Sequence, residues 1–188
     1  MSPPHLRANT TLAVLREATR DAHERLETRF DAVSLLASPD TRMATIEAYA
    51  AMHDAAERGL EPLLGEVEGL SFDERRRREL GRYAHTHIGP AFPTPTSRPE
   101  ALGLLYVIEG STLGGRIIRR TLAGQGIDEA ILSFLDPYGD RAGEFWKNFV
   151  SVLERETGGS EEAQSQAMRG AVCGFAFAEQ MLCGEVAR

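Results

Sequence analysis

The residue types best suited to chemistry in this sequence gather in its first predicted helix, over residues 10–30. On a helical wheel at about 100° per residue, Arg16, Arg20, His23 and Glu27 fall within about 60° of one another. Because Glu27 follows His23 by one turn, its carboxylate could accept the imidazole Nδ1–H and leave Nε2 free to bind a metal. The alternative is a solvated charged stripe with an ordinary His–Glu contact. This helix alone leaves both open.

A second unusual stretch is the glycine-rich run from Glu109 to Gly115. Gly110, Gly114 and Gly115 stand in a segment that is otherwise apolar enough to be a buried helix. Glycine inside a helix costs roughly 1 kcal/mol relative to alanine, so their presence needs a reason. One explanation is a loop or a close helix crossing. The other is a helix without side chains, whose backbone lies against a flat ligand.

The elements that must position these two stretches are all helical. Apolar residues recur at helical spacing and no sustained strand-type alternation appears, so the sequence predicts an all-α fold. The helices are expected at about 10–30, 40–62, 71–87, 97–120, 141–157 and 161–186, with a short segment at 127–135 and a proline-rich loop at 90–99.

Length and composition favour one domain that binds neither nucleic acid nor membranes. The 188 residues are 42% hydrophobic, which suffices for one core, and we expect a flexible arm over 1–9 and a domain over 10–188. The net charge of −7 opposes attraction to polyphosphate or anionic lipid. The start MSPPHLRANT lacks the apolar core of a secretory signal, and no uncharged apolar run reaches the ~18 residues that cross a bilayer. A cytoplasmic protein is expected.

The sequence lacks the motifs of several common metal-binding and nucleotide-binding sites. There is no Glu-x-x-His di-iron pattern, HExxH, P-loop or GxGxxG. The only cysteines are Cys173 and Cys183, so a disulfide framework, a thiolate zinc site and a covalently bound heme are poorly supported. The basic run from Arg75 to Arg78 is expected to be a solvated helix face, with a patch that steers an acidic partner as the alternative.

In its motifs and their order, the chain resembles the heme oxygenase family, specifically its soluble bacterial branch. The resemblance runs from Leu12 to about Cys183 and rests on LREATRDAHERLE, LGLLYVIEGSTLGGRII, YGDRAGEFWKNFVSVLE and FAFAEQM. It implies a single-domain helical bundle that sandwiches heme b, both cofactor and substrate, between a proximal helix and a kinked, glycine-rich distal helix. It also implies O2- and reductant-dependent cleavage of heme to biliverdin, ferrous iron and CO.

The resemblance assigns roles on the proximal side and around the heme carboxylates. His23 would be the axial iron ligand, Glu27 its hydrogen-bonding partner, and Phe175 an aromatic of the heme pocket. Guanidinium groups suit carboxylates because they bind them by paired, charge-assisted hydrogen bonds. The residues implied near the carboxylates are Arg16, Arg20, Tyr106 and Lys147.

On the distal side, the resemblance assigns the wall over the heme to Gly110, Ser111, Gly114 and Gly115. Animal members carry an acid where this chain has Ser111, so the polar groups that serve bound oxygen must be organised differently here. His53 is a candidate for that set.

The resemblance also implies partners: a ferredoxin or flavoprotein reductase as electron donor, and a bilin-binding photoreceptor as an acceptor of the product. Two other functions stay open. One is a heme-holding or heme-sensing protein on the same fold that does not turn over its ligand. The other is a thiaminase-like helical enzyme, which would need a cysteine nucleophile; Cys173 and Cys183 are instead expected to be packing residues of a buried final helix.

Overall fold

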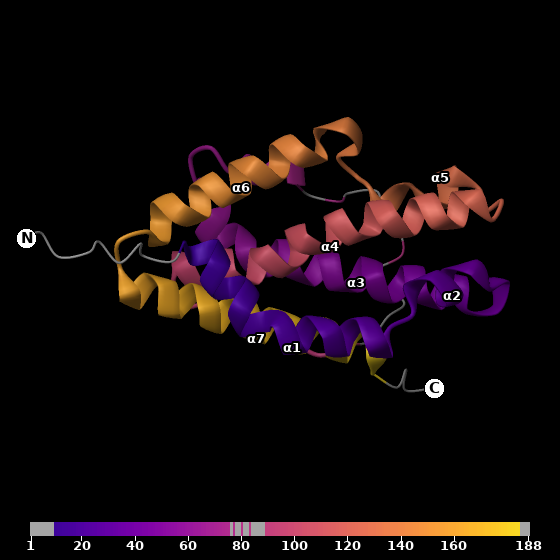
Figure 1. Ribbon diagram of the computed structural model, residues 1–188, viewed down its shortest axis with the longest axis horizontal. Coiled ribbons are helices and arrows are strands. Elements are labelled where there is room, and N and C mark those ends of the chain that lie inside the picture. Colours follow the sequence, from indigo (N-terminus) through magenta and orange to yellow (C-terminus); the bar gives the residue numbers. More distant parts are fainter. Residues whose placement is uncertain (1–9, 76, 78–79, 81–82, 84–88, 185–188) are drawn as a thin grey trace, which may run out of the picture.

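The structure is a computed structural model that describes residues 10–75, 77, 80, 83 and 89–184, and every regular element within them is helical. This confirms the predicted all-α class. In Figure 1, α6 lies above, α3 and α4 cross the middle, and α1 lies beside α7 below. The α-helices are α1 (Thr11–Arg29), α2 (Ala32–Ala37), α3 (Pro39–Leu64), α4 (Arg98–Gly124), α5 (Glu129–Leu132), α6 (Ala142–Thr157) and α7 (Glu161–Cys183), and the short 3-10 helices include η1 (Phe72–Arg75), η3 (Ser133–Leu135) and η4 (Gly139–Arg141).

Polar caps fix the starts of the helices that form the site. The side-chain oxygens of Thr10, Ser97 and Ser160 each accept a hydrogen bond from the backbone amide three residues on, at 3.3, 3.4 and 3.2 Å. Such caps satisfy amides that have no partner in the first turn. The predicted starts of α1, α4 and α7 are confirmed for this reason.

Two parts of the fold differ from the sequence prediction. Helix α2 was not predicted; Asp31 caps it by accepting from the Ser34 amide at 3.0 Å. The prediction that an α-helix starts at Ser71 is wrong: Ser71 has a φ of 50°, a left-handed conformation that an N-cap residue does not adopt, and the 3-10 helix η1 follows it instead. The rest of that prediction, over 76–87, and the arm over 1–9 fall largely outside the described residues.

Helix α4 is the centre of the molecule, and α7 packs against it backbone to backbone. A Cβ on Gly103 would lie 1.9 Å from the Ala167 carbonyl oxygen, and a Cβ on Gly170 would lie 2.0 Å from that of Glu100. Only glycine permits this approach. By length and composition alone α4 could cross a membrane, but 56% of its apolar stretch is buried in the fold, which is typical of a central core helix.

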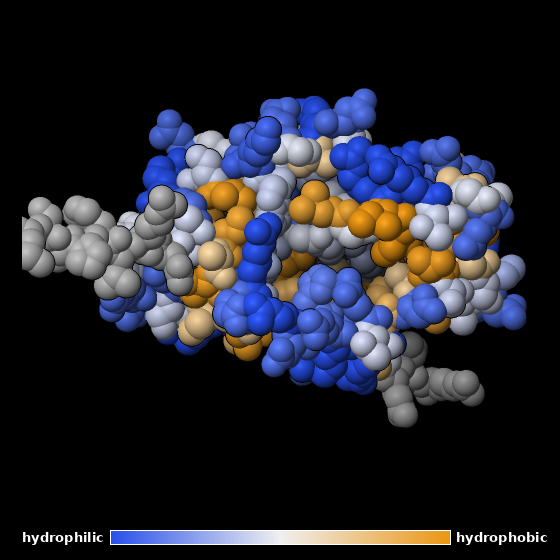
Figure 2. All heavy atoms as spheres, in the orientation of Figure 1, coloured by the Kyte–Doolittle hydropathy of each residue, from blue (hydrophilic) through white to orange (hydrophobic). Residues whose placement is uncertain are grey.

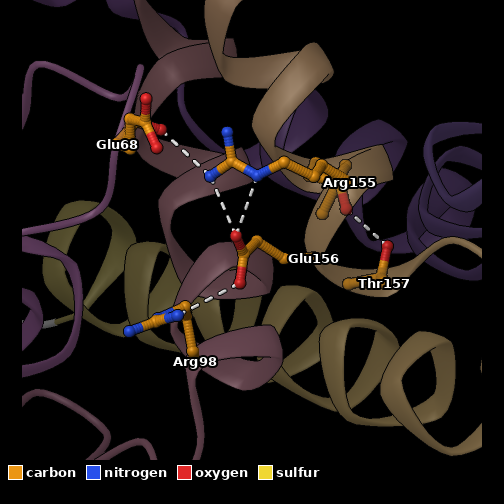
Figure 3. A network of polar contacts seen from close by, with 6 residues as sticks. Glu68, Arg98, Arg155, Glu156 and Thr157 are labelled. Atoms are coloured by element: carbon orange, nitrogen blue, oxygen red, sulfur yellow. Dashed lines mark hydrogen bonds and ion pairs between the residues drawn. The ribbon is translucent and has the colours of Figure 1, made fainter.

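A polar network ties the first residue of α4 to the end of α6 (Figure 3). Arg98 Nη1 lies 3.2 Å from Glu156 Oε2, and Arg155 Nε donates to the other oxygen of that carboxylate at 3.0 Å. Arg155 also donates to the Glu68 carbonyl at 3.0 Å. These contacts are partly exposed, so each adds little stability.

Candidate functional site

A cavity of about 490 Å³ lies between α1 and α4, within the range of roughly 300–1,000 Å³ typical of small-molecule sites. Figure 2 shows this face of the molecule hollowed, with hydrophobic residues along the upper rim and hydrophilic residues along the lower rim. Most of the lining is apolar, and α3, η3 and α7 supply part of it through Met52, Phe134 and Phe175.

The α1 wall of the cavity carries the predicted histidine and its carboxylate. His23 Nδ1 lies 3.4 Å from Glu27 Oε2, and 55% of the histidine side chain is exposed. Its ring stands edge-on to Phe175, with the two ring centroids 5.7 Å apart. His23, Glu27, Arg16 and Phe175 all line the cavity, so the structure brings these four predicted residues together.

The α4 wall is bare backbone at two of its glycines. Gly110 and Gly114 line the cavity, and a Cβ on either would have no atom of the described residues, beyond the helix's own nearby backbone, within 4 Å. Gly115 also lines the cavity, but its Cβ would lie 2.2 Å from the Leu135 carbonyl oxygen of η3. The explanation by a close crossing therefore applies at Gly115, whereas Gly110 and Gly114 face open space.

Of the other predicted site residues, two line the cavity and two lie on the protein surface. Ser111 and Tyr106 line the cavity, and the Ser111 hydroxyl donates to the Ile108 carbonyl at 2.7 Å. Arg20 and Lys147 are absent from the described lining; both are exposed, and Arg20 pairs with Glu17.

The sequence did not single out Trp146 as a site residue, yet it lines the cavity, with its ring centroid 6.3 Å from that of Tyr106. Its position in α6 reaches the cavity only because α6 packs across α4, which no local pattern reveals. It is the only tryptophan of the chain, so its fluorescence can report on this cavity.

Behind α4, two arginines that were expected on the surface are buried. The side chains of Arg75 and Glu109 are 3% and 2% exposed, and Nη1 of the first lies 2.7 Å from Oε2 of the second. Arg77, also buried, donates from Nη2 to the Thr112 hydroxyl at 2.5 Å. The predicted solvated face is wrong for these two arginines because protein acceptors replace water around them; Arg76 and Arg78 lie outside the described residues.

His53 is buried near the cavity without lining it. Its ring centroid lies 4.7 Å from that of Tyr49, a lining residue. Neither ring nitrogen has a hydrogen-bond partner among the described residues. Burial, and then the positive charge of Arg77, lower the pKa of His53 well below its usual value, so the ring is neutral.

The cysteines take no part in this cavity. Cys173 is exposed and Cys183 half-buried, and neither is among the described lining residues. The prediction that both are packing residues is wrong for Cys173, which lies on the outer face of α7. Burial raises the pKa of the Cys183 thiol, which keeps it protonated. A thiaminase-like enzyme would therefore lack its nucleophile at this site.

The residues of the cavity fit a heme. A porphyrin ring needs a slot with apolar walls, its iron accepts an imidazole nitrogen, and its carboxylates need donors. The cavity offers one histidine in the second half of α1, open space over Gly110 and Gly114, and the donors Arg16 and Tyr106. In the part of the chain that the structure describes, no group of three or more His, Cys, Asp or Glu side chains is arranged to hold a bare metal ion.

Known proteins similar to this chain agree on one family. "Heme oxygenase" of Xanthomonas campestris pv. campestris is 38% identical over 62% of this chain and 73% of its own length. "Heme oxygenase PigA" of Pseudomonas aeruginosa is 30% identical over 93% of this chain and 92% of its own length. The NO- and CO-bound heme oxygenase of Neisseria meningitidis shares the fold, with a TM-score of 0.70 and 22% identity over 93% of this chain and 91% of that one. No protein-family model matches. The chain belongs to the heme oxygenase family.

Proposed function

We propose that this protein cleaves heme b to biliverdin, ferrous iron and CO, using O2 and electrons from a reductant. One observation carries the proposal: a single apolar cavity has His23 on its α1 wall and the bare backbone of Gly110 and Gly114 on its α4 wall. Membership of the heme oxygenase family supports the same reaction. Bound heme supplies the iron at which dioxygen is reduced and is also the molecule that is opened.

On the α1 wall, His23 would hold the iron. Its Nδ1 lies 3.4 Å from the Glu27 carboxylate, so a neutral ring directs Nδ1–H toward Glu27 and leaves the Nε2 lone pair for the metal. Phe175 stands edge-on to the ring and limits its rotation. The exposed Glu27 therefore fixes the tautomer of His23 while the buried Phe175 fixes its plane.

Arg16 and Tyr106 would hold the heme carboxylates. Both line the cavity, one from α1 and one from α4, so the two donors reach the ligand from opposite walls. Holding the carboxylates sets the rotation of the ring, and the rotation decides which bridging carbon faces α4. Arg20 and Lys147 lie outside the wall, so they have no direct contact with the ligand in this proposal.

On the α4 wall, the chain keeps acid and base side chains away from the reacting face. Gly110 and Gly114 present only backbone there. The Ser111 hydroxyl is committed as a donor to the Ile108 carbonyl, so it has no proton to give to the ligand. The buried imidazole of His53 packs against Tyr49 and does not line the cavity. The wall therefore confines the ligand by shape.

The proposed reaction needs an electron donor and has a coloured product. We assign the donor to a ferredoxin or flavoprotein reductase, since these proteins deliver single electrons, and place the reaction in the cytoplasm. If biliverdin serves as a chromophore and is not just a by-product of releasing iron from heme, its proposed acceptor is a bilin-binding photoreceptor.

A turnover experiment tests the proposal. Purified protein is mixed with hemin in air, a ferredoxin, its reductase and NADPH are added, and the absorption spectrum is followed. We expect the Soret band to disappear and biliverdin, identified by chromatography, to form in amounts equal to the heme consumed. A Soret band that persists after complete reduction and exposure to air would refute the reaction and favour a protein that only holds heme.

A further inference from the structure

Glu109, the residue directly before Gly110, is held by two partners on the side of α4 away from the cavity. Arg75 Nη1 lies 2.7 Å from Oε2, with the two side chains 3% and 2% exposed. Tyr138 donates its hydroxyl proton to Oε1 at 2.9 Å. Both carboxylate oxygens are thereby engaged, which fixes the rotamer of the buried Glu109 side chain.

The two partners of Glu109 are themselves fixed by the surrounding elements. Arg75 donates from Nε to the Leu70 carbonyl at 2.6 Å and from Nη2 to the Phe145 carbonyl at 3.1 Å. Tyr138 stacks on the Phe145 ring, with centroids 4.2 Å apart and planes 10° apart. Glu109 is therefore attached to the loop before η1, to the turn before η4 and to α6 at once.

A second buried guanidinium holds the next turn of α4. Arg77 donates from Nη2 to the Thr112 hydroxyl at 2.5 Å and from Nη1 to the Phe134 carbonyl of η3 at 3.2 Å. Glu109 and Thr112 flank Gly110 and Ser111 in the sequence. The wall at Gly110 is thus held from behind at residues on either side of it, Glu109 and Thr112.

This stretch needs support from behind because, among the described residues, no atom outside the neighbouring turns lies within 4 Å of where a Cβ on Gly110 or Gly114 would stand. Gly110 and Gly114 have no side chain to pack there, and each glycine lowers the intrinsic stability of the helix. We propose that Glu109 is a positioning residue: held by Arg75 and Tyr138, it sets where the Gly110 backbone stands relative to a ligand in the cavity. The identity of that ligand rests on the proposed function, whereas the support of α4 does not.

Hydrogen–deuterium exchange of the heme-free protein tests the support directly. Tyr138→Phe keeps the ring stacked on Phe145 and removes only the hydroxyl that Glu109 accepts. We expect the amides of residues 110–115 to exchange about tenfold faster or more, the size of effect that follows from losing a hydrogen bond to a buried charge, while residues 100–105 of the same helix keep their rate. Glu156→Gln, which weakens the partly exposed ion pair at the other end of α4, is the matched control and should leave the exchange of residues 110–115 unchanged.

The heme spectrum and the ratio of biliverdin isomers show whether Glu109 positions the wall for the ligand or only stabilises the fold. With hemin bound, Tyr138→Phe should keep the ferric spectrum of the unmodified protein but change the ratio of biliverdin isomers, because the ring face nearest Gly110 is no longer confined in the same way. Thr112→Val, which removes the acceptor for Arg77, should act in the same direction. Unchanged exchange at residues 110–115 in both variants, or faster exchange with an unchanged isomer ratio, would overturn the proposal. If the unmodified protein forms no biliverdin, the proposed function fails, and exchange in the heme-free protein still decides whether Glu109 supports α4.

Discussion

Adding one methyl group to α4 should have opposite effects at two adjacent glycines. Gly114→Ala places a Cβ in open space, with no atom of the described residues outside the neighbouring turns within 4 Å. Gly115→Ala places it 2.2 Å from the Leu135 carbonyl oxygen and 3.1 Å from the carbonyl carbon. Both contacts at Gly115 are with backbone, which cannot swing away as a flexible side chain would.

The expected free-energy changes follow from these contacts. Replacing glycine by alanine inside a helix stabilises it by roughly 0.5–1 kcal/mol when the Cβ meets nothing. Gly114→Ala should therefore raise the free energy of unfolding by about that amount. For Gly115→Ala the same gain is offset by an overpacking cost of about 1–3 kcal/mol, at its upper end because η3 must shift. With a cost of about 3 kcal/mol and a gain of about 0.5–1 kcal/mol, the net loss is about 2–2.5 kcal/mol, or a fall in Tm of about 4–10 °C for a chain of this size.

Urea unfolding followed by Trp146 fluorescence measures both changes, and hemin titration by quenching of the same residue shows whether the ligand is still bound. Gly114→Ala should be as stable as the unmodified protein or more so, should bind hemin, and should form less biliverdin because the methyl group occupies the wall facing the ligand. If Gly114→Ala proves as destabilising as Gly115→Ala, Gly114 does not face open space and the description of the wall is wrong.

Four further changes test other parts of the site. His23→Ala should abolish the histidine-ligated ferric heme spectrum while far-UV circular dichroism stays unchanged; an unaltered spectrum would remove His23 from the iron. Arg16→Ala should raise the Kd for hemin about tenfold or shift the biliverdin isomer ratio, since a charge-assisted hydrogen bond is worth about 1.5–3 kcal/mol. Lys147→Ala, which changes a residue outside the cavity wall, should do neither, and equal effects of the two substitutions would contradict the assignment. Arg75→Leu should lower the free energy of unfolding by about 3–5 kcal/mol because it leaves a buried carboxylate without its cation, and a loss below about 1 kcal/mol in urea unfolding would show that the pair is not buried. Burial depresses the pKa of His53 in the folded protein, so below pH about 6.5 the unfolded chain binds a proton that the folded chain excludes. The free energy of unfolding is therefore highest above that pH and falls as the pH drops. His53→Leu should remove this part of the loss between pH 7 and 5, and an unchanged pH dependence would contradict the assignment.

The parts of the fold that local patterns determine were predictable from the sequence. The capping residues Thr10, Ser97 and Ser160 mark helix starts by chemistry confined to one turn. The pairing of His23 with Glu27 follows from helical spacing within α1. These predictions succeeded because each depends on residues a few positions apart.

The parts that depend on packing between distant segments were not predictable in this way. Gly114 and Gly115 look alike in the sequence and both line the cavity, yet a Cβ on Gly114 would meet open space and one on Gly115 would clash with η3. The sequence pattern predicts that Arg75 and Arg77 are exposed, because the groups that bind them, such as the Glu109 carboxylate, are distant in the sequence. An acid inside an otherwise apolar helix was the available signal, since a buried carboxylate requires a buried cation nearby.

The central claim is that heme sits between the His23 imidazole and the backbone of Gly110 and Gly114, and a crystal structure of the hemin complex tests it most directly. The account predicts electron density for the porphyrin in this cavity, with His23 Nε2 bonded to the iron and no side chain between the opposite ring face and the two glycines. Iron bonded to another residue, or a porphyrin outside the space between α1 and α4, would contradict it.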